Sequence, residues 1–251
     1  DVTLVDTLAH DGLRDAFERD SMGLSTERHG EGLAISREEQ DAFAASSHAR
    51  AAAAADFLRG EIAPFQTPGR SGRLVEADDG VRADTTVEVL ARLRPAFRED
   101  GTITAGNASQ ISDGAAALVL VSDEEAERRG LTGARILGHA LVAGPDVSLH
   151  AQPANAIVAA CARAGLEVGE LSAVEINEAF AVVALASVDL LGIDPAIVDA
   201  NGGAIALGHP IGASGARIVG HLARRLAALG GDAVGAAALC GGGGQGSAVV
   251  L

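Results

Sequence analysis

Polar and apolar positions in residues 1–100 follow a pattern that predicts helices joined by exposed connections. The clearest helix begins at Ser36, because Ser36 and Glu39 form the capping-box pattern, in which each side chain bonds the other residue's backbone N–H. The run of alanines at 51–55 extends this helix, since alanine has the highest helix propensity. Two further segments, a connection rich in proline and glycine and a second helix, are predicted at 64–80 and 85–93.

After about residue 101, short apolar runs alternate with longer amphipathic segments. Alternation of strands with helices is typical of an α/β layered fold, so the predicted fold class is α/β. Ser122 begins a short acidic helix. The expected strands are 115–121, 134–142, 173–177, 233–240 and 247–251. The expected helices are 153–165, 179–191 and 212–229.

The charge and composition of the chain exclude several classes of partner. Its 251 residues include 19 Lys and Arg against 34 Asp and Glu, a net charge of −15, so nucleic acid and anionic membranes are not expected partners. No apolar run of about 18 residues predicts a membrane span. Two cysteines form no disulfide framework, which predicts a reducing, cytoplasmic location. No spacing of His or Cys suggests a metal site.

Glycine is concentrated at residues 241–246, directly after a predicted strand. The string fits G-x-G-x-x-G, but a dinucleotide site needs a helix next, whereas residues 247–251 predict a strand. No lysine follows, so a P-loop is also excluded. The remaining interpretation is a hairpin whose Gly242 N–H faces a developing oxyanion beside Cys240. A tight turn without chemistry stays open as an alternative.

Two polar residues occupy positions where α/β proteins often place site residues. His209 lies among small residues in a loop just before a helix, so a substrate can approach its imidazole; a purely structural histidine is the alternative. Asn177 follows a strand, where it serves a site or caps the next helix. Cys161 lies among alanines in the middle of a helix and is expected to be an inert core thiol.

Several segments of the chain together resemble the thiolase family. The three C-terminal ones are NEAF at 177–180, NGGAIALGHPIGASGAR at 201–217 and CGGGGQG at 240–246, in the family's order. The segment GTITAGNASQISDGAA at 101–116 resembles the family's coenzyme A loop. Further similarity lies at 36–44 and 93–97. The resemblance covers the whole chain.

This resemblance implies a layered αβαβα fold and an acyl-CoA C-acyltransferase that makes or cleaves a carbon–carbon bond through an acyl-cysteine. His209 matches the histidine that activates the nucleophilic cysteine and lines an oxyanion hole, and Asn177 matches the asparagine that holds a water there. Cys240 matches the cysteine that moves the α-proton. Gly242 matches the glycine whose N–H serves a second oxyanion hole. No cofactor is implied beyond the coenzyme A thioester, which is the substrate.

The resemblance also implies contacts to coenzyme A and to the acyl group. Ser109 matches a contact to the pantetheine arm, and Arg82 matches one to the nucleotide. The other substrate-binding positions that it implies are Ala105, Ala179, Phe180, Met22 and Leu149. At Ser21-Met22-Gly23 and Leu149-His150 the chain departs from the His-Met-Gly and Met-Gly of acetoacetyl-CoA members, which leaves the acyl-chain length open.

Three domains follow from the resemblance, and so does one expected gap. Residues 1–110 correspond to the loop domain, 111–132 to a segment returning to the N-terminal half, and 133–251 to the C-terminal domain. Neither cysteine occupies the nucleophile's motif, so we expect a fragment or one piece of a split enzyme. The family's habit predicts a homodimer or homotetramer. Two alternatives remain, an inactive coenzyme A-binding relative and a thiol hydrolase built on Cys240, His209 and Asn177.

Overall fold

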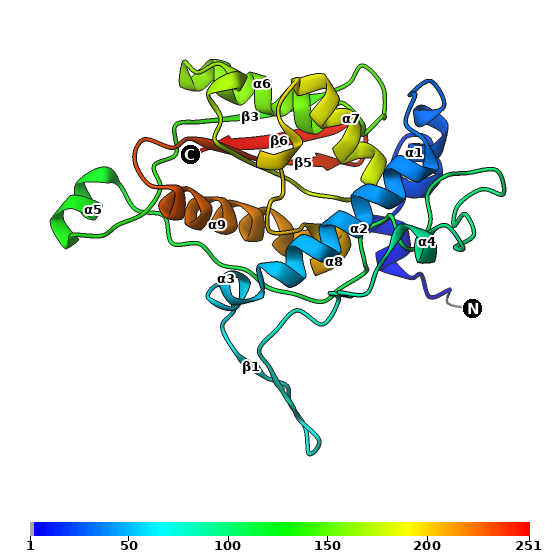
Figure 1. Ribbon diagram of the computed structural model, residues 1–251, viewed down its shortest axis with the longest axis horizontal. Helices are drawn as coiled ribbons and strands as arrows, with labels where there is room; N and C mark the ends of the chain where they lie inside the picture. The colour runs from blue at the N-terminus through cyan, green and yellow to red at the C-terminus, as the bar shows by residue number, and fades with distance from the viewer. Residues whose placement is uncertain (1–2) are drawn as a thin grey trace.

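The computed structural model describes residues 3–251, which are built around a four-stranded mixed sheet (Figure 1). Its strands are β3 (Gly138–Ala143), β6 (Gln245–Val250), β5 (Gly235–Gly241) and β4 (Ala173–Ile176), in that spatial order. The pairs β3–β6 and β6–β5 are antiparallel, and β5–β4 is parallel. The predicted α/β fold and these four strands are confirmed, although β3 begins and ends later than the predicted segment 134–142.

Helices cover both faces of this sheet. The helices α6 (Gln152–Ala164) and α7 (Ala181–Leu191) lie on one face, and α9 (Ile211–Leu229) lies on the other (Figure 1). Side chains alternate along β5, so Ala238 packs against the first layer and Ala237 packs against α9. Both faces are therefore apolar, and the residues at the ends of the strands are the ones left to face a site.

The predicted capped helix forms α2 (Arg37–Ala53). The Ser36 hydroxyl accepts the Glu39 N–H, and the Glu39 carboxylate accepts the Ser36 N–H at 2.7 Å, which confirms the capping box. Figure 1 shows α2 running beside α7 and the short α8 (Ala204–Leu207). The alanine run is divided at Ala54. Five further helices are η1 (Leu8–Gly12), α1 (Met22–Gly30), α3 (Ala55–Arg59), η2 (Val168–Glu170) and η3 (Pro195–Ile197).

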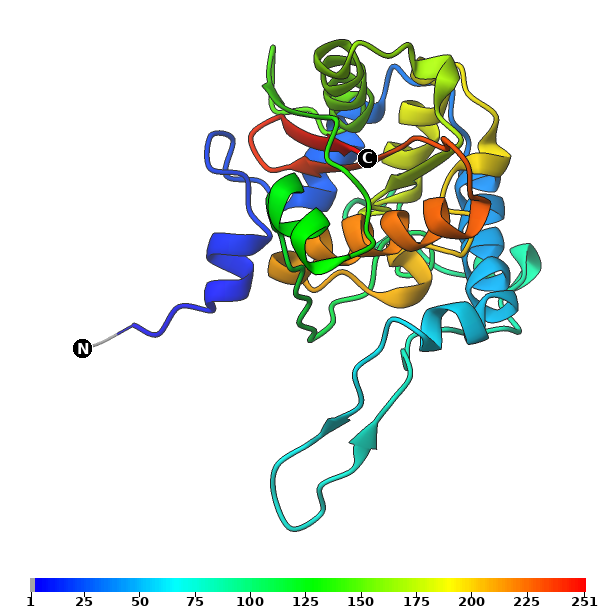
Figure 2. The same ribbon diagram turned by 90° about the vertical axis from the view of Figure 1, so that its left-hand side faces the viewer.

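The segment 64–80 projects from the body of the protein as a long ribbon (Figure 2). It contains only two short antiparallel strands, β1 (Phe65–Gln66) and β2 (Leu74–Val75), and most of its residues are exposed, as predicted. No helix formed by residues 3–251 combines the length and the apolar character that crossing a membrane requires.

Two predicted elements are wrong or shortened. Residues 115–121 form no strand, and Val119 is 90% exposed, because no strand in the described part of the chain lies beside this run to pair with its backbone. The helix predicted at 85–93 is reduced to α4 (Val87–Leu90), which is too short to gain from cooperative helix propagation. The acidic helix is confirmed as α5 (Asp123–Arg129), capped by a neighbouring serine hydroxyl.

Candidate active site

The ends of β4 and β5 bring Asn177 and Cys240 to the same edge of the sheet. The two strands are parallel, with Ile176 opposite Ala238, so the residues that end each strand leave the sheet side by side. The Asn177 N–H donates to the Ala238 carbonyl at 2.9 Å, two residues before Cys240. Two positions that are 63 residues apart along the chain are thereby neighbours by strand register.

The Asn177 side chain is buried without any hydrogen bond. Only 1% of the residue is exposed, and neither its Nδ2 nor its Oδ1 has a partner among residues 3–251. The residue that caps α7 is Phe180, without a side-chain bond, so Asn177 does not cap this helix and that alternative is excluded. An unpaired buried polar group costs about 1–3 kcal/mol. Proteins tolerate such groups where they serve chemistry or a bound molecule.

His209 is held in one orientation by its neighbours. Its backbone N–H donates to the Gln110 carbonyl at 3.0 Å, and its ring Nδ1 lies 2.6 Å from Ser214 Oγ. The Ser214 hydroxyl also lies 3.0 Å from the Pro210 carbonyl. When this hydroxyl donates to Pro210, it accepts the Nδ1–H of His209, and the lone pair of the ring is on Nε2.

The surroundings of His209 favour its neutral form. Burial lowers the pKa of His209 below the usual value of histidine, and the positive charge of Arg217 lowers it further. A neutral imidazole with a free Nε2 is a general base at physiological pH. The helix that follows, α9, packs its first turns against Leu239, the residue before Cys240, since a Cβ on Gly215 would contact Leu239 Cδ1 at 3.9 Å.

Cys240 lies beside a cluster of apolar side chains. Its half-buried side chain packs against the cluster that contains Leu149 and Phe180, with Met22 and Ala179 beside them. Burial raises the pKa of the Cys240 thiol to about 12. The thiol is therefore protonated at neutral pH, and its thiolate is a stronger base than that of an ordinary cysteine.

The glycines after Cys240 form the predicted hairpin, with Gly241 opposite Gln245. Two of them adopt positive φ, as a tight turn of this kind requires, and the Asp15 carboxylate holds the turn by accepting the Gly243 N–H at 2.9 Å. Gly242 is exposed, and no acceptor among residues 3–251 takes its N–H. A donor that is rigidly held and unpaired can stabilise a developing oxyanion.

The segment that resembles a coenzyme A loop runs alongside the residues after β4. Ala108 forms a β-bridge with Phe180, and the Ser109 N–H donates to the Ala179 carbonyl at 3.0 Å. Ala108 also packs against the same apolar cluster as Met22 and Cys240. The structure thus brings Ser109, Ala179 and Phe180 together with the predicted acyl-pocket residues.

Arg82 and Ala105 lie away from this apolar cluster. Arg82 is exposed in the loop that follows the ribbon, and its N–H donates to His48 Nδ1 at 3.1 Å. Ala105 is exposed in a turn closed by the bond from the Asn107 N–H to the Thr104 carbonyl. Their predicted contacts to coenzyme A stay predictions.

Three residues of the site were not predicted from the sequence. Ser214 and Glu178 lie inside the segments that were singled out, so each could have been examined as a partner of His209 or Asn177. Glu178 is 1% exposed, and burial raises its pKa to about 7. Asp15 carries no signal of its own, because its partner Gly243 is 228 residues away.

Comparison with known proteins identifies two matching domains of one family. Residues 1–124 match the thiolase N-terminal domain, and residues 131–251 match the thiolase C-terminal domain. A probable acetyl-CoA acetyltransferase of Mycolicibacterium smegmatis is 56% identical over 257 residues, and one of Mycobacterium tuberculosis is 54% identical over 256. Both alignments cover the whole of this chain. They cover only 66% of the length of the first relative and 65% of the length of the second.

Solved structures give the same result. The crystal structure of the Bacillus anthracis acetyl-CoA acetyltransferase superposes with a TM-score of 0.93 at 38% identity. Human mitochondrial 3-ketoacyl-CoA thiolase superposes with a TM-score of 0.89 at 36% identity. Each match covers 100% of this chain and 64% of the other. The chain therefore spans about two thirds of the length of the proteins that it matches.

Proposed function

Because this chain belongs to the thiolase family, we propose that it provides the proton-transfer and coenzyme A-binding parts of an acyl-CoA C-acyltransferase. The reaction makes or cleaves a carbon–carbon bond between acyl-CoA thioesters through an acyl-cysteine. The observation that carries the proposal is the unpaired amide of Asn177, buried at the same sheet edge as Cys240. A neutral His209 and the free Gly242 N–H complete the groups that such chemistry needs.

In the acyl-transfer half-reaction, His209 is the general base. Its Nε2 takes the proton of the nucleophilic thiol, while Ser214 holds the Nδ1–H. The thiolate attacks the thioester carbonyl, and the carbon–sulfur bond to coenzyme A breaks. The departing coenzyme A thiolate takes the proton of the Cys240 thiol, so Cys240 enters the second half-reaction as a thiolate. Cys161 cannot be this nucleophile, since it is 1% exposed within α6. Because Cys240 has another role, the proposal requires an acyl-carrying thiol outside residues 1–251.

In the condensation half-reaction, Cys240 moves the α-proton. As a thiolate it takes this proton from the second acyl-CoA. The resulting carbanion attacks the acyl-cysteine, and the sulfur that is released takes back its proton from His209. In the cleavage direction the protonated thiol returns the proton. Because burial raises the pKa of Cys240 to about 12, its thiolate, once formed, is a strong base for this proton. Asn177, with His209, and Gly242 stabilise the oxyanions of the two half-reactions.

Substrate binding follows from the apolar cluster around Phe180. Met22 and Leu149 line the acyl end, and Ser109 and Ala179 lie along the pantetheine arm. Ala105 and Arg82 contact the more distant parts of coenzyme A, and Arg82 meets the nucleotide phosphates. The enzyme acts in the cytoplasm as a homodimer or homotetramer.

Substitution of Cys240 tests the proposal. In the enzyme that contains this chain, Cys240→Ala forms the acyl-enzyme from a simple acyl-CoA but loses condensation by about 10²–10⁴-fold, the usual contribution of an acid–base group. His209→Ala is slow in both half-reactions. The assays are mass spectrometry of the acylated protein and the steady-state condensation rate.

Two outcomes would overturn this assignment. If the acyl group is found on Cys240 itself, the protein is a thiol hydrolase of the Cys-His-Asn type. If coenzyme A binds but no acyl-enzyme forms in the parent protein, the chain belongs to an inactive coenzyme A-binding relative. A separate test of binding is Arg82→Ala, which should raise the acyl-CoA KM more than it lowers kcat, because it acts far from the reacting atoms.

A further inference from the structure

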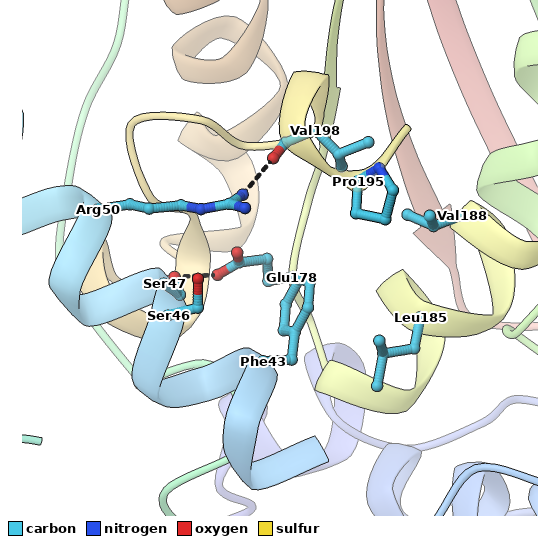
Figure 3. A pocket seen from close by; sticks show the side chains of 9 residues that line it. All are labelled: Phe43, Ser46, Ser47, Arg50, Glu178, Leu185, Val188, Pro195 and Val198. Carbon is cyan, nitrogen blue, oxygen red and sulfur yellow. Dashed lines mark hydrogen bonds between the residues drawn. The ribbon is translucent and has the colours of Figure 1, made fainter. Parts of the chain in front are cut away.

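The carboxylate of Glu178 joins three segments that are distant along the chain. Glu178 Oε2 accepts the Ser47 hydroxyl at 2.7 Å (Figure 3). The same oxygen also accepts the Ile205 N–H at 2.9 Å. Ser47 lies in α2, and its oxygen in turn accepts the Gly203 N–H at 3.1 Å. The carboxylate and the hydroxyl together hold two backbone N–H groups of the loop 201–208.

This contact is close, and Glu178 is only 1% exposed. Gly203 lies against the carboxylate, since a Cβ at this position would be 2.4 Å from Glu178 Cδ. On its other side Glu178 borders a cavity of about 70 Å³ with mostly apolar walls, which Phe43 and Leu185 also line (Figure 3). In such surroundings hydrogen bonds to a charged group are stronger than in water.

The joined segments carry two of the proposed site residues. Asn177 immediately precedes Glu178 in the chain, and the loop 201–208 leads through α8 directly into His209. The Asn177 amide has no hydrogen bond to hold it, and His209 is held only at its own N–H and ring. The contact between Glu178 and the loop therefore sets the relative position of two groups that must converge on one carbonyl oxygen.

We propose that Glu178, with Ser47, is a positioning residue that fixes the loop carrying His209 against the strand end carrying Asn177. Glu178 touches neither the substrate nor the reacting atoms, and it acts through the Ser47 hydroxyl and the Ile205 N–H. The expected effect on kcat rests on the proposed function. The expected effect on the titration of His209 does not, because it can be measured without catalysis.

The charges around Glu178 make its ionisation part of this role. Burial raises its pKa to about 7, while the Ser47 hydroxyl, the Ile205 N–H and the charge of Arg217 on α9 act in the opposite direction. The other charged groups that face it are Glu175 on β4, Asp199 in the loop after η3 and Arg50 on α2. Loss of the Ser47 donor removes a bond that favours the ionised form, so the pKa of Glu178 rises further.

The test compares Ser47→Ala with Ser46→Ala. Both serines lie on α2 and line the same cavity, but only Ser47 bonds Glu178. In the enzyme that contains this chain, Ser47→Ala should lower kcat on the order of tenfold, short of the roughly 10²-fold that a 1 Å misplacement can cost. The acyl-CoA KM should change little, and the acid limb of the pH profile of kcat should move to higher pH. Ser46→Ala should change none of these.

A second measurement on the chain of residues 1–251 uses NMR titration of His209. Loosening of the loop admits water, so Ser47→Ala should raise the pKa of His209 toward its ordinary value, whereas Ser46→Ala should not. If Ser47→Ala lowers only the melting temperature and leaves the His209 titration unchanged, the positioning role is refuted. An inactive parent enzyme with a shifted His209 would instead refute the proposed function alone. If Ser47→Ala fails to fold, Glu178→Gln, which keeps an acceptor oxygen without the charge, is titrated in its place.

Discussion

Two neighbouring glycines of the hairpin should respond very differently to the same substitution. Gly243 and Gly244 both adopt positive φ, at 77° and 67°. A Cβ on Gly244 would lie 1.8 Å from the Asp146 carbonyl oxygen, which belongs to the backbone. A Cβ on Gly243 would lie 2.9 Å from the ring of Phe17, which is 76% exposed and can rotate away. Gly243→Ala therefore measures the loss of stability from the backbone conformation alone. Gly244→Ala measures this loss together with that from the close contact to the Asp146 carbonyl.

The magnitudes follow from these contacts. An L-residue in the left-handed region costs about 1–2 kcal/mol, which applies to both variants. Gly244→Ala also forces the hairpin away from the loop at 144–147, which breaks the bond from the Gly144 N–H to the Gly244 carbonyl, 3.0 Å long. A typical hydrogen bond contributes about 0.5–1.5 kcal/mol. We expect a loss of about 1–2 kcal/mol for Gly243→Ala and at least about 1.5–3.5 kcal/mol for Gly244→Ala.

Equilibrium unfolding in urea measures the difference. The chain has no Trp or Tyr, so far-UV circular dichroism is the appropriate probe. If the two variants lose the same stability within about 0.5 kcal/mol, the hairpin does not pack against the 144–147 loop as described. In the active enzyme Gly244→Ala should also lower kcat, because the hairpin carries the Gly242 N–H.

Three further predictions concern charge, thiols and exposed apolar surface. Burial raises the pKa of Asp15, but backbone N–H donors outweigh it and hold this pKa below its usual value. The ionised carboxylate therefore stabilises the fold above about pH 4, and this contribution is lost as the pH falls through the lowered pKa. The difference in the free energy of unfolding between Asp15→Asn and the parent should accordingly shrink below pH 4. With a pKa of about 12, Cys240 should react with iodoacetamide about tenfold faster for each unit by which the pH is raised, up to pH 10. Cys161, which is 1% exposed, should react more slowly at every pH. A reaction rate of Cys240 that stops rising near pH 9 would contradict the raised pKa. Val119 and Leu120 are 90% and 73% exposed, so the double substitution to serine should reduce aggregation in light scattering without lowering the melting temperature.

The elements whose signals are local could be predicted from the residues alone. The helix α2 begins at Ser36 because the capping box needs only residues three apart. The hairpin after Cys240 was predicted because glycines between two apolar runs allow a tight turn. His209 was likewise singled out by its immediate neighbours, and its bond to Ser214 spans only five residues. The alternation of strands and helices gave the α/β class, because periodicity is also a local property.

Which of these elements meet, and what each side chain bonds, depends on the packing of the whole fold. Residues 115–121 have the composition of a strand, but a strand forms only where a neighbour pairs with its backbone, and none of the described strands does so here. The bond between Ser47 and Glu178 spans 131 residues, and that between Asp15 and Gly243 spans 228. Such contacts depend on how the sheet and helices pack, and one polar residue in a sequence does not identify its distant partner. The pKa of Cys240 is decided in the same way, because desolvation depends on the walls that packing builds around a thiol.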